Sequence, residues 1–206
     1  MNFVDLFIHT DKVLANLVGQ YGLLTYLVIF IIIFLETAFV VTPFLPGDSL
    51  LFIAGTLAAQ NMLNVYILFA LTAFAAILGD SANYYIGKYV GEKFFEKNRL
   101  IKKEYIERTK EFYDKHGGKT IILARFIPII RTFAPFVAGV GKMDYKRFFM
   151  FNVIGGILWT GLFLFAGYLF GNLSIVKDNL TYVIIIIIGL SMVPGIIEFW
   201  RQKRKN

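Results

Sequence analysis

The stretch Arg125-Phe-Ile-Pro128-Ile-Ile-Arg131-Thr-Phe-Ala-Pro135, continuing to Gly139, decides the fold of this chain. It places two arginines and two prolines inside an apolar run that extends over residues 120–140. Because proline has no backbone N–H and clashes with the preceding turn, we expect the helix to break at Pro128 and again at Pro135. A broken segment that carries guanidinium groups cannot face lipid, since neither its carbonyls nor its charges would be satisfied. We therefore expect this stretch to be buried in protein or to line a wet cavity.

The composition around this stretch is that of a membrane protein. Of the 206 residues, 57% are apolar and 17% are charged, whereas soluble domains average about 25% charged residues. The chain has no cysteine and two histidines, so we expect no metal and no other cofactor. A net charge of +7 does not predict nucleic-acid binding here, because the basic residues flank apolar segments as the positive-inside rule describes. The first twenty residues lack the pattern of a removable signal peptide.

Apolar segments of about 20 residues predict four transmembrane helices within a single membrane domain, residues 1–206. The predicted transmembrane helices cover 21–41, 65–90, 148–170 and 181–200. We expect the remaining polar segments to form an interfacial helix, a cytoplasmic amphipathic segment and a basic cytoplasmic tail, at 1–20, 91–119 and 201–206 respectively. The excess of Lys and Arg in the last two segments places both termini in the cytoplasm.

Two apolar segments are too short and too interrupted to cross the membrane, and we predict that each forms a re-entrant hairpin. The first hairpin covers residues 42–60, with Asp48 or Ser49 capping its short helix. The second covers residues 120–141 and contains the two arginines. The charge asymmetry of the loops requires the first to enter from outside and the second from inside.

The two hairpins belong to a sequence pattern that occurs twice. The first copy contains Phe44-Leu-Pro46, Phe52-Ile-Ala-Gly55 and Gly87-x3-Gly91, and the second contains Phe126-Ile-Pro128, Phe136-Val-Ala-Gly139 and Gly167-x3-Gly171. Since the copies have opposite predicted orientations, the pattern indicates an inverted repeat. Paired, interrupted segments in inverted halves are typical of transporters that bind their substrate near the midplane. The predicted fold is therefore an all-α polytopic membrane protein: four transmembrane helices, two oppositely oriented re-entrant hairpins and amphipathic interfacial helices.

Five ionisable side chains lie at membrane depth, where each costs about 2.5–3.5 kcal/mol on insertion scales. They are Glu36, Asp48, Asp80, Arg125 and Arg131. One interpretation is a set of structural salt bridges that hold the hairpins together. The alternative, which we favour, is that Arg125 and Arg131 bind a phosphate headgroup, because a guanidinium matches phosphate in a bidentate geometry. Glu36 and Asp48 would then couple transport to protons or act as charge partners of the arginines.

Other polar and hinge residues are predicted to support this site. Asp80, Asn83 and Tyr84 share one helical face, and polar packing against the second hairpin explains them as well as a role in the pathway does. Asn152, Gly155, Gly156 and Trp159 share another face, for which close helix packing is the simpler explanation. The remaining supporting positions are the hairpin residues Pro46, Gly47, Pro128, Pro135 and Gly139.

Four motifs together resemble the DedA family, also described by its VTT or SNARE-associated-Golgi domain. They are Glu36-Thr, Pro43-Phe-Leu-Pro-Gly-Asp48-Ser-Leu-Leu, Gly79-Asp80-x2-Asn83-Tyr84-x2-Gly87 and Ala124-Arg125-Phe-x-Pro128-x2-Arg131-Thr-x3-Pro135-x3-Gly139. Two further stretches, 113–119 and 194–198, are similar to the family's founding bacterial member. The resemblance implies a bacterial inner-membrane protein with two re-entrant hairpins that moves lipids between leaflets. It also implies dependence on acids at Glu36 and Asp48 and on arginines at Arg125 and Arg131.

The predicted function is thus a flippase or scramblase for a phosphate-bearing lipid, such as undecaprenyl phosphate or a phospholipid, coupled to the proton motive force. Its partners would be membrane lipids and protons, and a homo-oligomer is compatible with the sequence. The alternative is a proton-coupled cation antiporter that maintains membrane potential and pH, in which the arginines are structural partners of the carboxylates. An intramembrane enzyme is not expected, because Asp48 and Asp80 follow glycine without the fuller Gly-x-Gly-Asp pattern and histidines are scarce.

Overall fold

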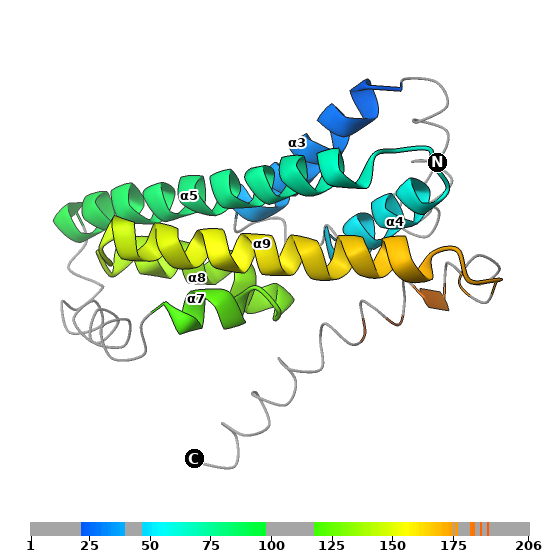
Figure 1. Cartoon of the computed structure of the whole chain (residues 1–206). Coiled ribbons are helices and arrows are strands. Elements are labelled where there is room, and N and C mark those ends of the chain that lie inside the picture. The colour runs from blue at the N-terminus through cyan, green and yellow to red at the C-terminus, as the bar shows by residue number, and fades with distance from the viewer. Residues whose placement is uncertain are drawn as a thin grey trace, which may run out of the picture.

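The computed structural model describes residues 22–39, 47–97 and 118–174, together with 176, 182, 183, 186 and 189. The expectations for residues 1–20, for the tail at 201–206, for Pro46 and for most of 181–200 lie outside these residues. Every element in the described ranges is a helix, in agreement with the predicted all-α class. In chain order (Figure 1) they are α3 (Leu24–Ala38), α4 (Gly47–Ala59), α5 (Val65–Lys97), α7 (Lys119–Ala124), α8 (Pro128–Val140) and α9 (Tyr145–Phe170).

Two of these helices, α5 and α9, are long and apolar enough to cross a membrane, over 65–90 and 145–170. They lie side by side and run in opposite directions (Figure 1). Each begins directly after an Asx residue whose side chain caps the first turn. Asn64 accepts from the backbone N–H of Tyr66 at 3.0 Å, and Asp144 accepts from that of Arg147 at 2.9 Å. A capped polar start followed by a predominantly apolar run explains why both helices form.

The second predicted hairpin is a broken helix. Helix α7 ends at Ala124, and α8 begins at Pro128, after Ile127 in an extended conformation. This is the conformation that a following proline imposes. The expected second break at Pro135 is wrong, because α8 continues through this residue to Val140. Pro135 removes one N–H donor, but close packing against α5 holds the backbone in a helical path.

Two further boundaries differ from the predictions. Helix α4 begins at Gly47, so Asp48 and Ser49 lie inside its first turn and neither is the N-cap. Helix α5 continues to Lys97, beyond the expected start of a separate polar segment at residue 91. A helix in progress gains one hydrogen bond for each added residue, so polar residues that follow an apolar span extend it readily.

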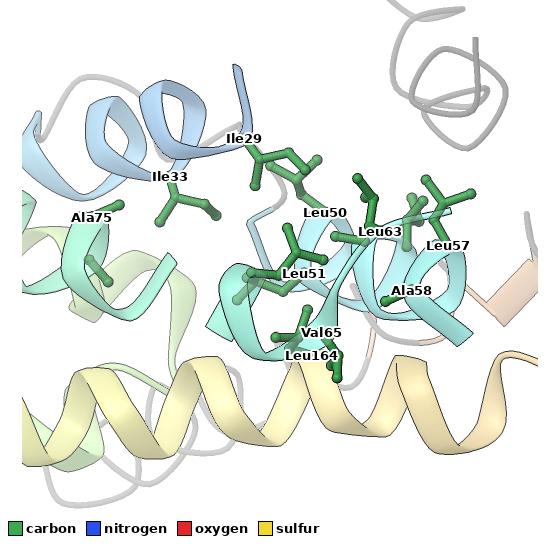
Figure 2. Close-up of a cluster of buried hydrophobic side chains, with 14 of the residues drawn as sticks. Ile29, Ile33, Leu50, Leu51, Leu57, Ala58, Leu63, Val65, Ala75 and Leu164 are labelled. Carbon is green, nitrogen blue, oxygen red and sulfur yellow. The ribbon is translucent and has the colours of Figure 1, made fainter. Parts of the chain in front are cut away.

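The core lies between α3, α4, α5 and α9. Figure 2 shows Ile29 and Ile33 of α3 facing Leu50 and Leu51 of α4, with Leu164 of α9 on the far side. The outward faces are equally apolar: Leu23, Leu27, Ile31 and Leu35 all leave large side chains exposed at the start and along the outer face of α3. The buried set, by contrast, includes the ionisable residues Glu36, Asp48, Asp80, Arg125 and Arg131. Apolar residues on the outside and charges within are the arrangement expected of a protein surrounded by lipid.

Two helix crossings are so close that only glycine fits. Where α4 crosses α9, a Cβ on Gly55 would overlap the carbonyl of Leu164, and one on Gly167 would overlap that of Phe52. Where α5 crosses α8, Gly87 and Gly139 stand in the same relation to the backbones of Phe136 and Tyr84. These four glycines occupy matching places in the twofold sequence pattern. The first copy of the pattern contains α4 and α5, and the second contains α8 and α9. The short helix of each half, α4 or α8, therefore packs on the long helix of the other half, α9 or α5.

The turns after the two short helices also match. Asn61 and Lys142 both adopt positive φ, at 59° and 53°. The next backbone N–H reaches five residues back in each case, from Met62 to Leu57 at 3.1 Å and from Met143 to Ala138 at 3.0 Å. This pairing is the Schellman ending of a helix. The two halves thus share a glycine crossing, a helix ending and an Asx cap in the same order.

We predict that Gly167→Ala destabilises the protein, while Gly161→Ala on the same helix does not. The added methyl at position 167 meets the α4 backbone, which cannot move aside, so a loss of about 1–3 kcal/mol is expected. At position 161 it comes no closer than 3.4 Å to the Phe69 ring. Thermal unfolding of the two purified variants in the same detergent measures the difference. Equal stability of the two variants would contradict the close crossing.

Candidate functional site

Arg131 lies at the centre of a buried charge cluster that joins three helices. From α8, its Nη1 contacts Asp48 Oδ1 of α4 at 2.8 Å, and its Nη2 forms an ion pair with Glu36 Oε1 of α3. The Arg131 residue is 4% exposed and Glu36 is fully buried. One guanidinium therefore holds two carboxylates that come from sequence positions 83 and 95 residues away. Both contacts are charge-assisted hydrogen bonds, which are stronger than bonds between neutral groups.

Glu36 also caps the beginning of α4. Its Oε1 accepts a hydrogen bond from the backbone N–H of Gly47, the first residue of that helix, at 3.0 Å. Glycine at position 47 leaves room for this contact, because a Cβ there would overlap the Glu36 carboxylate and displace it. The helix N-terminus carries a partial positive charge, so it stabilises the anion together with Arg131. Asp48 lies in the same first turn, and both acids therefore benefit from the α4 dipole.

Trp159 of α9 completes the Arg131 cluster. Its indole N–H donates to Asp48 Oδ1 at 2.7 Å, and the Arg131 Cζ lies 4.7 Å from the centre of its ring. A buried guanidinium over an indole face gains a cation–π interaction. The sequence pattern predicted only helix packing for Trp159. One signal in the sequence could have revealed this role. Trp159 is a single large aromatic residue on a helix face that otherwise carries two glycines and an asparagine.

Arg125, which directly follows the end of α7 at the helix break, forms a second cluster. Its Nη2 makes an ion pair with Asp80 of α5, donates to Asn152 Oδ1 of α9, and lies 3.5 Å from the carbonyl of Ala76. Asn152, in turn, donates to the Ser81 hydroxyl at 3.2 Å. Asn152 is the second residue for which the sequence predicted only packing.

The glycines of α9 make room for the Arg125 side chain. A Cβ on Gly155 would lie 3.0 Å from Arg125 Cδ, and one on Gly156 would lie 3.5 Å from Arg125 Nη1. A larger residue at position 155 would push the Arg125 side chain away from Asp80 and Asn152, whereas one at position 156 would first meet Ile77, whose Cγ1 would lie 2.9 Å from the added Cβ. The expected small-residue face of α9 therefore serves a charged side chain as well as helix packing.

Asn83 joins the helices that carry Glu36 and Arg131. Its amide donates to the carbonyl of Thr37 at 3.2 Å and to the carbonyl of Thr132 at 2.7 Å. These two carbonyls belong to the residues that directly follow Glu36 and Arg131. Asn83 of α5 therefore links α3 and α8 through hydrogen bonds to both, which fixes the spacing between these two helices.

The other predicted supporting residues lie outside the charge clusters. The Tyr84 hydroxyl donates to the carbonyl of Met143, and its ring stacks on Phe148 at 4.6 Å between centroids. Gly139 lies at the α5–α8 crossing, and Pro128 begins α8. The geometry therefore gives Tyr84 and Gly139 roles in packing. It brings Glu36, Gly47, Asp48 and Asp80 together around the arginines, while Asn83 bonds to the backbone next to Arg131.

Several polar atoms of the clusters have no hydrogen-bond partner among the described residues, although they are shielded from solvent. They are Arg125 Nε and Nη1, Arg131 Nε, Glu36 Oε2 and Asp80 Oδ1. Unsatisfied buried donors on arginine are costly, so they mark places where an anionic group would bind favourably. Among the described residues, the buried charged side chains are three carboxylates and two guanidiniums.

The fold and the site together define a helical membrane protein that keeps a cluster of paired charges in its interior. Comparison with known sequences identifies the family: the chain belongs to the VTT domain (DedA) family, whose domain matches residues 45–169. It is 53% identical to Protein DedA of Escherichia coli K12 over 205 residues, 98% of this chain and 94% of that protein.

More distant relatives are also membrane proteins by name. An uncharacterized membrane protein of Mycobacterium leprae, ML0287, is 42% identical over 85% of this chain and 80% of its own length. Inner membrane protein YqjA of E. coli K12 is 31% identical over 88% of this chain and 86% of its own length. No solved structure matches the chain.

Proposed function

We propose that this protein is a lipid transporter, a flippase or scramblase, that carries a phosphate-bearing lipid across the inner membrane. The carrying observation is the buried Arg131, which two carboxylates and an indole hold in the interior of a lipid-exposed protein. A guanidinium at membrane depth costs free energy, and side chains of this kind mark binding sites or transport pathways. The planar set of N–H donors of arginine matches the oxygens of a phosphate group. Undecaprenyl phosphate and phospholipids both carry such a headgroup.

The proposed transport cycle exchanges the partners of the arginines. In the structure, Glu36 and Asp48 neutralise Arg131, and Asp80 neutralises Arg125. A phosphate headgroup would replace carboxylate oxygens on Arg131, while Arg125 offers two further unpartnered donors nearby in the chain. The lipid tail would remain in the bilayer against the apolar outer faces. A proton taken up by the released acid would couple the cycle to the proton motive force.

The matching halves support the finer fold within this proposal: four transmembrane helices and two re-entrant hairpins in an inverted repeat. The long helices α5 and α9 run in opposite directions (Figure 1), and each is crossed by the short helix of the other half at a glycine pair. Inverted repeats allow two halves to exchange conformations around one central site. No catalytic step is part of the proposal.

We predict that both termini and the 91–119 segment face the cytoplasm. The relative YqjA is named an inner membrane protein, which supports placing this chain in the same membrane. Single cysteines introduced at Lys97 and Lys203 should stay unlabelled by an impermeant thiol reagent in intact cells, and those at Asn61 and Asn179 should be labelled. The absence of native cysteine gives a clean background. External labelling at position 97 would overturn the orientation and the inverted repeat.

A proton-coupled cation antiporter is the second candidate. Among the described residues, three buried carboxylates share two guanidiniums, which favours it, since one of the two acids that share Arg131 could bind a proton or a cation. In that case both arginines would be permanent structural partners. The first candidate is preferred because two guanidiniums at the centre of a cation path would repel the cargo.

Reconstitution distinguishes the two functions. Purified protein in liposomes is assayed for headgroup movement between leaflets and, in parallel, for sodium- or potassium-driven proton exchange with an internal pH dye. Lipid movement without cation exchange supports the proposal. Cation exchange without lipid movement would replace it with the antiporter.

A further inference from the structure

We infer that the Glu36 carboxylate occupies the binding place of the substrate phosphate, so that Glu36 is a tethered competitor of the headgroup. This inference rests on the proposed function and specifies its binding site. The binding place, hereafter the anion seat, consists of the α4 N-terminus at Gly47 and the Arg131 guanidinium, beside the Trp159 indole that holds Asp48. The ligand class is a phosphate monoester or diester.

The first argument is what surrounds the Glu36 carboxylate. Its Oε1 receives both the Gly47 N–H at 3.0 Å and Arg131 Nη2. A first-turn backbone N–H, a glycine without a side chain and an arginine are the features with which proteins bind phosphate at helix N-termini. Helix α4 has 13 residues and therefore a full dipole behind its first turn. The carboxylate thus lies where an external oxyanion would make the same contacts.

The second argument is independent of the helix terminus. Arg131 is 4% exposed, yet its Nε has no partner among the described residues, while its two other nitrogens hold the two acids. Glu36 Oε2 is likewise buried without a partner. A carboxylate offers two oxygens in one plane and leaves this donor unused. A tetrahedral phosphate carries additional oxygens and can reach a third donor.

The third argument is the difference between the two acids. Asp48 Oδ1 is fixed by Arg131 at 2.8 Å and by Trp159 at 2.7 Å, and its helix supplies the seat itself. Glu36 reaches the seat from a different helix, α3, close to the end of that helix at Ala38. Release of Glu36 therefore needs only one side chain to move, whereas release of Asp48 would dismantle the seat. Glu36 is the acid that exchanges.

The exchange predicts the sign of a substitution effect. If Glu36 competes with the ligand, removing its carboxylate from the seat should strengthen anion binding. Glu36→Asp retains the negative charge but shortens the side chain by one methylene, so the carboxylate withdraws from Gly47. Glu36→Gln retains the length but loses the charge. A site in which Glu36 merely balances Arg131 would instead leave the affinity of Glu36→Asp unchanged.

The test uses the full chain in detergent micelles with Trp200→Phe, which leaves Trp159 as the only tryptophan of the sequence. Because Trp159 touches both Asp48 and Arg131, its fluorescence should report binding in the seat. The probes are dihexanoyl phosphatidic acid and inorganic phosphate. We expect each Glu36 variant to bind dihexanoyl phosphatidic acid at least about tenfold more tightly than the Trp200→Phe parent, which is about 1.4 kcal/mol. Thr72→Val is the matched control, since this buried threonine of α5 donates only to carbonyls of its own helix.

The two probes separate the sources of the phosphate. Tighter binding of phosphatidic acid alone assigns the seat to a lipid headgroup, and equal tightening for inorganic phosphate assigns it to the phosphate group itself. Unchanged or weaker binding by Glu36→Asp, with a control that behaves like the parent, would overturn the inference. Lipid movement in liposomes is scored separately, so a protein that transports lipid without this gain in affinity retains the proposed function and loses only the competitor role.

A measurement on the protein without substitutions at Glu36 covers the case in which the variants do not fold. A ligand in the seat displaces Glu36 from Arg131 and Gly47, which exposes its carboxyl to the apolar reagent dicyclohexylcarbodiimide. We expect dihexanoyl phosphatidic acid to increase modification of Glu36 at least about threefold in peptide mass spectra. Protection of Glu36 by the lipid, or no change, would contradict displacement.

Discussion

Arg131→Lys is expected to lower lipid transport by roughly 30-fold or more while the protein still inserts into the membrane. Lysine keeps the charge but replaces a planar fork by a single ammonium group, which cannot hold Glu36 and Asp48 at separate nitrogens. It also gives up the stacking of the guanidinium on Trp159. Losing one partner of a buried, hydrogen-bonded charge pair costs about 2–5 kcal/mol, and each 1.4 kcal/mol is a factor of ten.

The measurement is the initial rate of headgroup movement in liposomes at equal protein content. Lys142→Arg, outside the cluster in the turn before α9, is the control for a basic substitution that leaves the site intact. Transport by Arg131→Lys at the parental rate would show that bidentate contact with phosphate is not needed. A structural ion pair would then be the better account of Arg131.

Asp80→Leu is expected to destabilise the protein by about 3–5 kcal/mol, because it leaves the Arg125 guanidinium buried without its carboxylate. The remaining acceptors, Asn152 and the Ala76 carbonyl, are neutral. Arg125→Met alone should be similarly damaging, since it leaves Asp80 charged in the interior. The double substitution removes both charges, and replacing a buried pair by apolar residues is often neutral for stability. We therefore expect the double variant to recover most of the lost stability.

Denaturant unfolding in detergent gives the three free energies and hence the coupling between the two residues. Additive losses in the double variant would contradict a direct pair. The recovered double variant also tests the second arginine. If Arg125 helps to bind the phosphate headgroup, this folded double variant should transport lipid poorly. Transport at the wild-type rate would show that Arg125 has only a structural role, in which it holds α7 against α5 and α9.

The sequence alone predicts that the arginines are buried but not which groups meet them. Charges at membrane depth must be neutralised, and this constraint holds whatever the tertiary arrangement is. The choice of Glu36 and Asp48 for Arg131, and of Asp80 for Arg125, depends on how four helices pack. Trp159 contacts an aspartate 111 residues away, which no local spacing could reveal.

Local rules succeed at one proline and fail at the other for a physical reason. At Pro128 the chain needs a change of direction, and the extended Ile127 lets α8 begin there. At Pro135 the surrounding helix is held against α5, so the missing N–H costs less than unpacking the helix would. The repeated glycines could be recognised as small residues in the sequence. Their pairing across the two halves, Gly55 with Gly167 and Gly87 with Gly139, becomes apparent only in the structure.

The central claim is that this protein moves a phosphate-bearing lipid through the site around Arg131. The most direct test is the rate at which dithionite reduces NBD-labelled phosphatidic acid of the inner leaflet in liposomes that contain the purified protein. We predict faster reduction than in protein-free liposomes, further acceleration by an imposed pH gradient, and the protein-free rate with Arg131→Lys. A rate equal to that of protein-free liposomes, with and without the gradient, would contradict lipid transport.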